Sequence, residues 1–434
     1  MERFEINGGQ KLFGEITLDG AKNSALPILA ACVLINGTAV IHNCPKLTDI
    51  LYTFRILEGL GCKVEYDGKT ATVNAENISS DATDIRYADK MRSSVLFLGA
   101  LLGRLHSAKV NLPGGCRIGE RPIDLHINAL SDLGAEFFQS DERIIATAPR
   151  LLGEEIKLPF PSVGATENII LASVLVGGTT TIINAAREPE IADLADFLNK
   201  AGARIRGAGE YVIRIDGVKS LHGTEHTVIP DRIVASTYMS ACAACGGSVV
   251  MKNVRLSHLV PIVSVFNKLG CSMTVGGDVL MVSKKTPPRT IGTLETKPYP
   301  GFPTDSQPML CAALCRSRGT SVIKETVFEK RFLFAKELEK FGANISAENS
   351  TLKIQGTRHL KGADVTACDL RGGAALVIAA LSAKGKSTVN NIEYIDRGYE
   401  RFDEKLALLG ADIKRIYYEE GKEKDHNSKE AVGR

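Results

Sequence analysis

The chain has 434 residues, of which 44 % are hydrophobic and 24 % are charged, and this suits a folded protein of two or three domains. Its 53 lysines and arginines nearly balance 50 aspartates and glutamates, and a net charge of +3 is too small for electrostatic capture of nucleic acid or a membrane surface. The longest apolar run, residues 26–35, contains a proline and is shorter than the ~20 residues of a membrane span. The opening MERFEINGGQ lacks the apolar core of a signal peptide, so we expect a cytoplasmic protein.

Six apolar segments recur along the chain, and each begins with a polar or charged residue. A helix that is apolar all round needs cover on most sides, so these segments predict buried helices. In five of the six cases a short turn and a β-branched run follow, which predicts a strand. In chain order the segments are KNSALPILAACVL (22–34), RSSVLFLGALL (92–102), TENIILASVLV (166–176), DRIVASTYMSACAA (231–244), DSQPMLCAALC (305–315) and RGGAALVIAAL (371–381).

A second landmark is a glycine that closes an amphipathic helical segment, as in LEGLGCKV or LEKFGANI. Glycine suits the left-handed turn that stops a helix. Successive copies of this landmark lie 68 to 73 residues apart, so one unit recurs six times. The glycines are Gly61, Gly134, Gly202, Gly270, Gly342 and Gly410.

Six units of about 70 residues, each too small to hold a core alone, most simply form two domains of three units. The sequence therefore predicts an α/β fold in which each domain is an inside-out α/β barrel, with buried central helices and outer sheets. The expected boundaries are 22–229 for the first domain, 1–21 with 230–418 for the second, and 419–434 for a polar tail.

The starts of the buried helices should point toward a common region with their free N–H groups and positive dipole ends. An aspartate at such a start commonly caps its helix. Lysine and arginine oppose the dipole, and a bound polyanion explains why they occur there. The residues at these starts are Lys22, Asn23, Arg92, Thr166, Glu167, Asp231, Arg232, Asp305, Asp369 and Arg371.

The stretch LPGGCRIGERPIDLH, residues 112–126, combines a cysteine with a Gly-Gly pair and several charges. The glycines give an open approach to Cys116, while Arg117 and Arg121 can stabilise a thiolate or hold an anion beside the thiol. An unreactive cysteine in a surface turn fits the same residues, so local sequence leaves both interpretations open.

The other cysteines lie mostly in apolar segments, where a small thiol packs as a hydrophobe, and we expect free thiols. Cys242 and Cys245 have the spacing of a metal-binding pair but no second pair or histidine partner, so a zinc site is the weaker interpretation. Because no motif calls for a metal, a flavin or a nicotinamide, we expect no cofactor.

Eight motifs occur along the chain in a definite order: GAKNSALP (20–27), LPGGCRIGERPIDLH (112–126), SVGATEN (162–168), NAAREPEI (184–191), FPTDSQP (302–308), ETVFEKRF (325–332), DLRGGAAL (369–376) and IDRGYERF (395–402). In these motifs and their spacing, from about residue 1 to 417, the chain resembles the UDP-N-acetylglucosamine 1-carboxyvinyltransferases, a family of enolpyruvyl transferases. The resemblance implies transfer of the enolpyruvyl group of phosphoenolpyruvate to the 3'-hydroxyl of UDP-N-acetylglucosamine, with release of phosphate, as the first committed step of peptidoglycan synthesis.

The resemblance also implies roles for residues that match the family's motifs. Cys116 is the matched acid at C3 of phosphoenolpyruvate and the residue that forms a covalent adduct with it. Asp305 is the matched base for the hydroxyl proton, although its position also suits a helix cap. Asp369 would assist proton movement or orient Arg397, and a structural Asp-Arg pair is the alternative.

Both implied substrates are anions, which suits the planar guanidinium of arginine. The phosphoenolpyruvate group matched from the family is Lys22, Asn23, Arg121, Arg331, Arg371 and Arg397. The group matched for UDP-N-acetylglucosamine is Arg92, Arg121, Pro122, Ile123, Asp124, Leu125, Ser162, Val163, Gly164, Asp305 and Val327. Phe160 and Pro161 depart from the family pattern, in which many relatives carry a lysine, so one contact to the diphosphate is in doubt.

Two other functions remain to be weighed. An enolpyruvyl transferase acting on shikimate 3-phosphate shares the six-unit architecture, but that family lacks the cysteine on the glycine loop. A noncatalytic repeat scaffold for nucleotide or RNA would explain the six copies, but aromatic residues are sparse at 6 % and no basic stripe is present. We expect small-molecule partners, no nucleic acid and no membrane.

Overall fold

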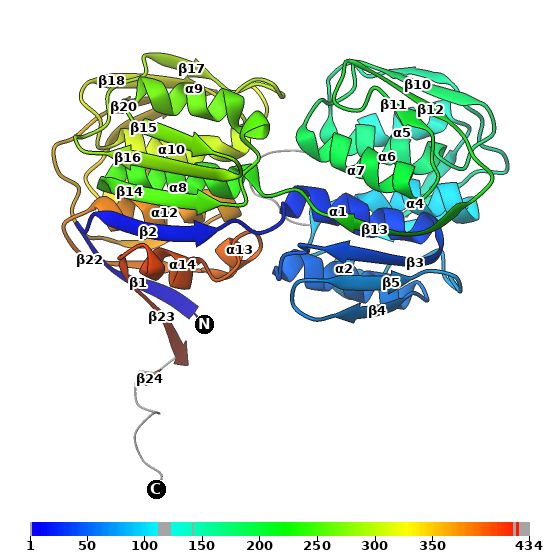
Figure 1. The fold of residues 1–434 in the computed structure, drawn as a ribbon, viewed down its shortest axis with the longest axis horizontal. Helices are drawn as coiled ribbons and strands as arrows, with labels where there is room; N and C mark the ends of the chain where they lie inside the picture. The colour runs from blue at the N-terminus through cyan, green and yellow to red at the C-terminus, as the bar shows by residue number, and fades with distance from the viewer. Residues whose placement is uncertain (1, 112–122, 141–142, 420–421, 425–434) are drawn as a thin grey trace, which may run out of the picture.

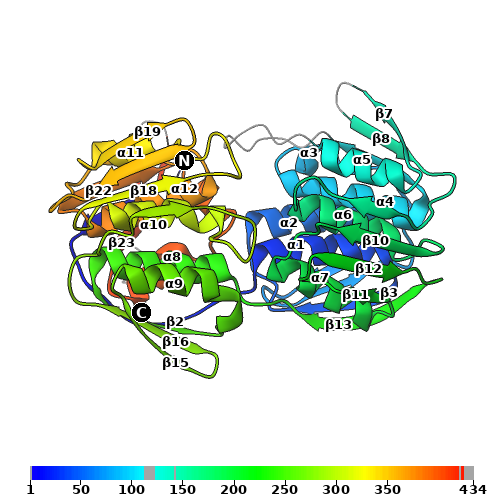
Figure 2. The same cartoon turned by 90° about the horizontal axis from the view of Figure 1, so that it is seen from above.

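The computed structural model describes residues 2–111, 123–140, 143–419 and 422–424. Its elements gather in two groups that lie side by side along the long axis of the molecule (Figure 1). Each group combines helices with three sheets, so the described part of the chain is a mixed α/β structure. A view from above shows the same two groups separated along the molecule (Figure 2).

In the first group, antiparallel hairpins are extended by a parallel neighbour in two of the three sheets. The strand orders are β13 (Leu221–Thr227), β3 (Ile35–His42), β5 (Ala71–Asn74), β4 (Lys63–Tyr66); β6 (Ser107–Asn111), β8 (Arg143–Thr147), β7 (Glu136–Gln139); and β11 (Ile205–Arg206), β12 (Val212–Asp216), β10 (Thr179–Ile183), β9 (Glu155–Lys157). The helices are α1 (Lys22–Ala31), η1 (Cys32–Leu34), α2 (Thr48–Gly59), α3 (Ile85–Ala88), η2 (Arg92–Val95), α4 (Leu96–Leu105), α5 (Asp124–Asp132), α6 (Val163–Ser173) and α7 (Pro189–Lys200).

The second group repeats this mixture and includes the first strands of the chain. Its strand orders are β15 (Ser272–Gly276), β16 (Val279–Lys284), β14 (Gly247–Lys252), β2 (Leu12–Thr17); β17 (Thr293–Glu295), β18 (Thr320–Lys324), β20 (Thr351–Gln355), β19 (Asn344–Glu348); and β21 (Asp364–Thr366), β22 (Gly385–Asn390), β1 (Glu2–Gly8), β23 (Asp412–Glu419), β24 (Lys422–Lys424). The helices are α8 (Arg232–Cys245), η3 (Leu256–Leu259), α9 (Val260–Lys268), η4 (Thr304–Ser306), α10 (Gln307–Leu314), α11 (Ala335–Lys340), α12 (Leu370–Ser382), α13 (Glu393–Asp396) and α14 (Phe402–Leu408).

The six apolar segments all form helices, and nearly every side chain of these helices is buried, as their sequences predict. The six closing glycines have φ between 79° and 103°, which confirms the predicted left-handed turns. The predicted β-branched runs form β3, β10, β14, β18 and β22. One boundary is wrong: α6 begins at Val163, so Thr166 and Glu167 lie inside the helix and not at its start.

Buried hydrophobic side chains form two separate clusters. One cluster draws its residues from positions 25–228, and the other from 4–18 and 233–413. Within each group the central helices contact one another, α4 against α6 and α8 against both α10 and α12. Over the described residues the sheets stay separate and open, so the expected barrel is not closed. Individual sheets cover the central helices instead.

Over the described residues the chain passes between the two groups twice, and the two passages are bonded to each other. Gly20 and Pro230 form an antiparallel bridge. The Ala21 N–H donates to the Ile229 carbonyl at 2.7 Å, and the Asp231 N–H donates to the Asp19 carbonyl at 3.0 Å. Next to the second passage, Arg232 at the start of α8 makes a buried ion pair with Glu190 of α7 through two hydrogen bonds, at 2.9 and 3.2 Å. This pair also connects the two groups. Within the described residues, none of the helices has the length and apolar character needed to cross a membrane.

Candidate active site

A buried carboxylate joins cations from the two groups of elements. Asp49, in the first turn of α2, is 2 % exposed and accepts from Lys22 Nζ at 2.6 Å and from Arg397 Nε at 2.9 Å. Burial raises the pKa of a carboxyl, but the charges of Lys22 and Arg397 outweigh burial and hold the pKa of Asp49 below its ordinary value. The ionised Asp49 carboxylate therefore holds Lys22 of the first group and Arg397 of the second group close to each other.

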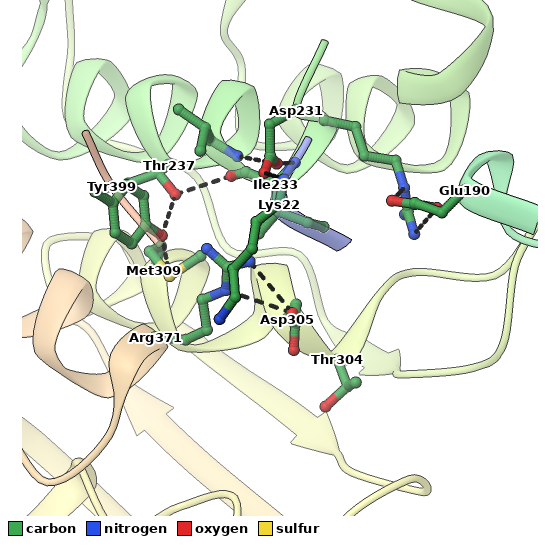
Figure 3. Close-up of polar contacts among 12 residues, drawn as sticks. Lys22, Glu190, Asp231, Ile233, Thr237, Thr304, Asp305, Met309, Arg371 and Tyr399 are labelled. Carbon is green, nitrogen blue, oxygen red and sulfur yellow. Dashed lines mark hydrogen bonds and ion pairs between the residues drawn. The ribbon is translucent and has the colours of Figure 1, made fainter. Parts of the chain in front are cut away.

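A second cluster lies around Asp305, which belongs to η4. Asp305 Oδ1 accepts from Arg331 Nη2 at 3.0 Å, and Oδ2 accepts from Arg371 Nη2 at 3.3 Å and Nε at 3.4 Å. Both arginines are 2 % exposed, and Figure 3 shows the Asp305 carboxylate against the Arg371 guanidinium, with Lys22 in the same close-up. Burial lowers the pKa of a guanidinium, but the neighbouring Tyr399 and Asp305 outweigh it and raise the pKa of Arg371.

The two arginines keep donors for a further anion. Arg331 Nε and Arg371 Nη1 are buried and have no acceptor among the described residues. A buried N–H without an acceptor costs free energy, and a negatively charged oxygen is the acceptor that suits a guanidinium. The cluster can thus bind a carboxylate or phosphate beside the carboxylate of Asp305.

A buried glutamate fixes the segment that carries Asp305. Glu325 is 3 % exposed; its Oε2 accepts from Thr304 Oγ1 at 3.0 Å, and its Oε1 accepts from the Val327 N–H at 2.9 Å. Arg331 Nη2 also donates to the Thr304 carbonyl at 3.2 Å. The Glu325 side chain therefore ties Val327 to Thr304, the residue before Asp305.

Two aspartates at helix starts serve as caps. Asp231 Oδ1 accepts from the N–H groups of Ile233 and Val234 at 2.8 and 2.9 Å, and its Oδ2 lies 3.3 Å from the Lys22 N–H. Asp369 Oδ1 accepts from the N–H groups at the start of α12, at 3.0 and 2.9 Å. Asp305 is not the cap of α10, which is Ser306.

The expected pairing of Asp369 with Arg397 is not among the contacts of Asp369, which lie at its own helix start and at Cys368 Sγ, 3.6 Å away. Among the described residues, Asp49 is a carboxylate that pairs with Arg397. Asp49 was missed from sequence because an acid in the first turn of an amphipathic helix looks like an ordinary partner of the helix dipole.

Most of the described positions matched for the nucleotide sugar lie on or beside η2, α5 and α6, whereas Asp305 and Val327 belong to the second group of elements. Ser162 caps α6, accepting from the Ala165 N–H at 3.4 Å, and leaves Val163 and Gly164 in the first turn. Arg92 and Asp124 both act electrostatically on His126 of α5, so these elements share one neighbourhood. Asn23 is exposed at the start of α1, and Ile123 and Leu125 are half-buried.

Three of the predicted residues, Cys116, Arg121 and Pro122, lie outside the described residues. The nine described cysteines are free thiols. No group of three or more His, Cys, Asp or Glu side chains in the described ranges has the arrangement of a metal site, and Cys242 is buried in α8 beside the Val282 carbonyl.

Comparison with known proteins places these features in context. Residues 6–406 match the model of the EPSP synthase (3-phosphoshikimate 1-carboxyvinyltransferase) family. The chain is 47 % identical over 416 residues to UDP-N-acetylglucosamine 1-carboxyvinyltransferase 2 of Caldanaerobacter subterraneus subsp. tengcongensis, covering 96 % of this chain and 100 % of the relative. It is 49 % identical over 420 residues to UDP-N-acetylglucosamine 1-carboxyvinyltransferase 2 of Carboxydothermus hydrogenoformans, again covering 96 % and 100 %.

Solved structures show the same architecture. The crystal structure of the enolpyruvyl transferase NikO from Streptomyces tendae matches with a TM-score of 0.87 and 28 % identity, over 95 % of this chain and 98 % of that one. EPSP synthase from Acinetobacter baumannii matches with a TM-score of 0.75 over 96 % and 100 % of the two chains, and at 18 % identity this likeness concerns the fold.

Proposed function

We propose the function of this chain from its family. The chain belongs to the EPSP synthase family of enolpyruvyl transferases and, within that family, to the UDP-N-acetylglucosamine 1-carboxyvinyltransferases. The protein transfers the enolpyruvyl group of phosphoenolpyruvate to the 3'-hydroxyl of UDP-N-acetylglucosamine and releases phosphate, which begins peptidoglycan synthesis. The observation that carries this function is 47 % identity to a relative of that name over 96 % of the chain.

The reaction adds the hydroxyl oxygen to C2 of phosphoenolpyruvate while C3 gains a proton. Loss of a proton from C3 and of phosphate from C2 then restores the double bond. Asp305 accepts the hydroxyl proton, because its carboxylate lies directly against the guanidinium groups of Arg331 and Arg371. Those donors receive the carboxylate of phosphoenolpyruvate, and Lys22 with Arg397 receives its phosphate.

The remaining roles come from the family resemblance. Cys116 supplies the proton at C3 and forms the covalent adduct, and Arg121 and Asn23 complete the phosphate site. Arg92, the segment Pro122 to Leu125, the start of α6 and Val327 hold the nucleotide sugar. The convergence of η2, α5 and α6 supports this last assignment.

The division of the chain into two domains belongs to the proposal as well. We assign residues 22–229 to one domain and 1–21 with 230–418 to the other, each built from three repeats with central helices and outer sheets. The two separate hydrophobic clusters support the division, since their residues follow these limits. A cytoplasmic location belongs to the proposal, because a reducing compartment suits buried thiols such as Cys242 and Cys311.

Phosphate release from phosphoenolpyruvate tests the function. We expect release with UDP-N-acetylglucosamine and none with shikimate 3-phosphate or without an acceptor. Release with shikimate 3-phosphate would assign the protein to the other transferase, and no release with either acceptor would favour a noncatalytic scaffold. The 18 % identity to EPSP synthase, against 47 % to the nucleotide-sugar relative, favours the first outcome.

Substitution of the base tests the roles within the site. Asp305→Ala should lower kcat by about 10²- to 10⁴-fold, because the hydroxyl proton then has no acceptor, while the Kd for UDP-N-acetylglucosamine changes little. Cys116→Ser should lose both turnover and the covalent adduct detected by mass spectrometry. An Asp305→Ala enzyme with kcat near that of the parent would remove Asp305 from the mechanism.

A further inference from the structure

His126 is a buried polar side chain for which the reaction described above has no role. It lies in the first turn of α5 and is 8 % exposed. α5 packs against α6, and the two helices are neighbours in Figure 2. A buried imidazole needs a partner for each ring nitrogen, so the surroundings of its two nitrogens decide what it can do.

The first ring nitrogen, Nδ1, accepts a hydrogen bond from the side chain of Asn168. The Asn168 side chain is fully buried, and its Oδ1 accepts from the Gly99 N–H at 2.8 Å. That bond fixes the orientation of the amide, whose Nδ2 donates to the Val95 carbonyl at 3.1 Å and to His126 Nδ1 at 2.7 Å. Because Nδ1 accepts, the proton of a neutral ring sits on Nε2.

The neutral form of the ring is the stable one at physiological pH. Burial, with the positive charge of Arg92 in addition, lowers the pKa of His126 to about 4, and Asp124 opposes this shift. His126 is therefore a fixed N–H donor that carries no charge.

The second nitrogen lies against the start of α6. A Cβ placed on Gly164 would approach His126 Cε1 to 2.9 Å and Nε2 to 3.2 Å, so the edge of the ring rests on this glycine. No described residue accepts from Nε2. The first-turn N–H groups of Val163 and Gly164 also have no acceptor among the described residues, as expected at a helix start.

We propose that His126 donates a hydrogen bond from Nε2–H to a diphosphate oxygen of the nucleotide sugar at the start of α6, and so favours a diphosphate-bearing ligand over a nucleoside. The inference rests on the proposed function. Asn168 is the positioning residue that holds the donor in this tautomer, and Gly164 is the residue whose missing side chain leaves room for the ring.

Nitrogen-15 NMR of histidine-labelled protein tests the tautomer and the contact without any substitution. We expect the His126 signals of a ring protonated at Nε2, assigned by their loss in His126→Gln, and a shift of the Nε2 resonance on addition of UDP. Uridine, which lacks the diphosphate, should leave that resonance unchanged. A ring protonated at Nδ1, or equal shifts with UDP and uridine, would overturn the proposal.

Binding measurements separate a ligand contact from a packing role. His126→Leu should weaken UDP binding by about tenfold to a hundredfold, the effect of losing one hydrogen bond to a charged group, and change uridine binding less than twofold. His126→Gln keeps an N–H donor of similar reach and should lose less. An unchanged Kd for UDP, or the same loss for uridine, would contradict the contact.

A matched control is His258→Leu in η3, since burial also lowers the pKa of His258 to about 4 and this residue lies in the other group of elements. It should leave the Kd for UDP unchanged. If His126→Leu does not fold, the NMR titration of the parent protein decides the question. If the parent protein releases phosphate with UDP-N-acetylglucosamine but the Nε2 resonance does not respond to UDP, the inference alone fails; if no phosphate is released, the proposed function fails.

Discussion

Asp49, whose side chain is 2 % exposed, links Lys22 of the first group of elements to Arg397 of the second. Removing a buried carboxylate that pairs with two cations is costly, because the largely buried ammonium of Lys22 then loses its ion pair. The same carboxylate determines how far apart the two proposed phosphate ligands lie.

Asp49→Asn should therefore affect both stability and substrate binding. We expect the free energy of unfolding to fall by about 3 to 5 kcal/mol, measured by urea denaturation at pH 7.5. The KM for phosphoenolpyruvate should rise while the Kd for UDP-N-acetylglucosamine stays close to that of the parent. Equal losses for both substrates would indicate general disruption and not a misplaced pair of cations.

Glu167 is a buried acid in α6 whose pKa is raised well above its ordinary value, first by burial and then by the negative charges of Glu190 and Glu188. Its folded pKa exceeds its unfolded pKa, so its contribution to stability is complete below about pH 4.3 and is lost as the pH rises. Glu167→Gln should remove this dependence.

The gain from Glu167→Gln should grow by up to about 1.4 kcal/mol per pH unit above pH 4.3, until the folded carboxyl ionises. Unfolding in urea at pH 5, 6.5 and 8 measures it. Glu65→Gln on the exposed face of β4 is the control and should give a constant difference. A gain at position 167 that does not vary with pH would show that this carboxyl is ionised in the fold.

Residue types in motifs could be read from the sequence, and partnerships across the fold could not. Lys22, Asp305 and Arg371 were identified as a polar group at helix starts, and they lie at helix starts. The partners Asp49 and Arg397 are 348 positions apart, and Arg232 and Glu190 are 42 apart, with no local pattern to connect them. Glu325 and His126 were missed because their hydrogen-bond partners, Thr304 and Asn168, are distant in sequence and become neighbours only in the folded chain.

At the scale of elements, α4 and α6 approach so closely that glycine is required at two positions. A Cβ on Gly99 would lie 2.4 Å from the Asn168 carbonyl, and one on Gly103 would lie 2.7 Å from the Leu171 carbonyl. Backbone atoms cannot move aside as a side chain can. The apolar pattern of RSSVLFLGALL predicted the buried helix, but not which neighbour would meet its glycines.

Gly103→Ala measures this packing. Alanine is the better helix former by about 1 kcal/mol, yet the clash should lower the free energy of unfolding by about 1 to 3 kcal/mol. Gly177→Ala is the matched control, because a Cβ there meets nothing within 4 Å. That control should be neutral or slightly stabilising. If Gly103→Ala behaved like the control, the two helices would not be in close contact in solution.

At the scale of the whole molecule, the two separate hydrophobic clusters predict two cooperative units. In differential scanning calorimetry we expect either two resolved transitions or a van't Hoff enthalpy clearly below the calorimetric enthalpy. One transition with equal enthalpies would mean that the ion pairs between the groups couple them completely.

The paired passages at residues 19–21 and 229–231 limit how the two bodies can move. A single connecting segment would let the two bodies bend and twist freely. Two segments hydrogen-bonded to each other permit bending about one axis and resist twisting. Any opening or closing of the two bodies would then follow one arc, and Asp231 in the second passage and Lys22 directly after the first would lie close to its axis.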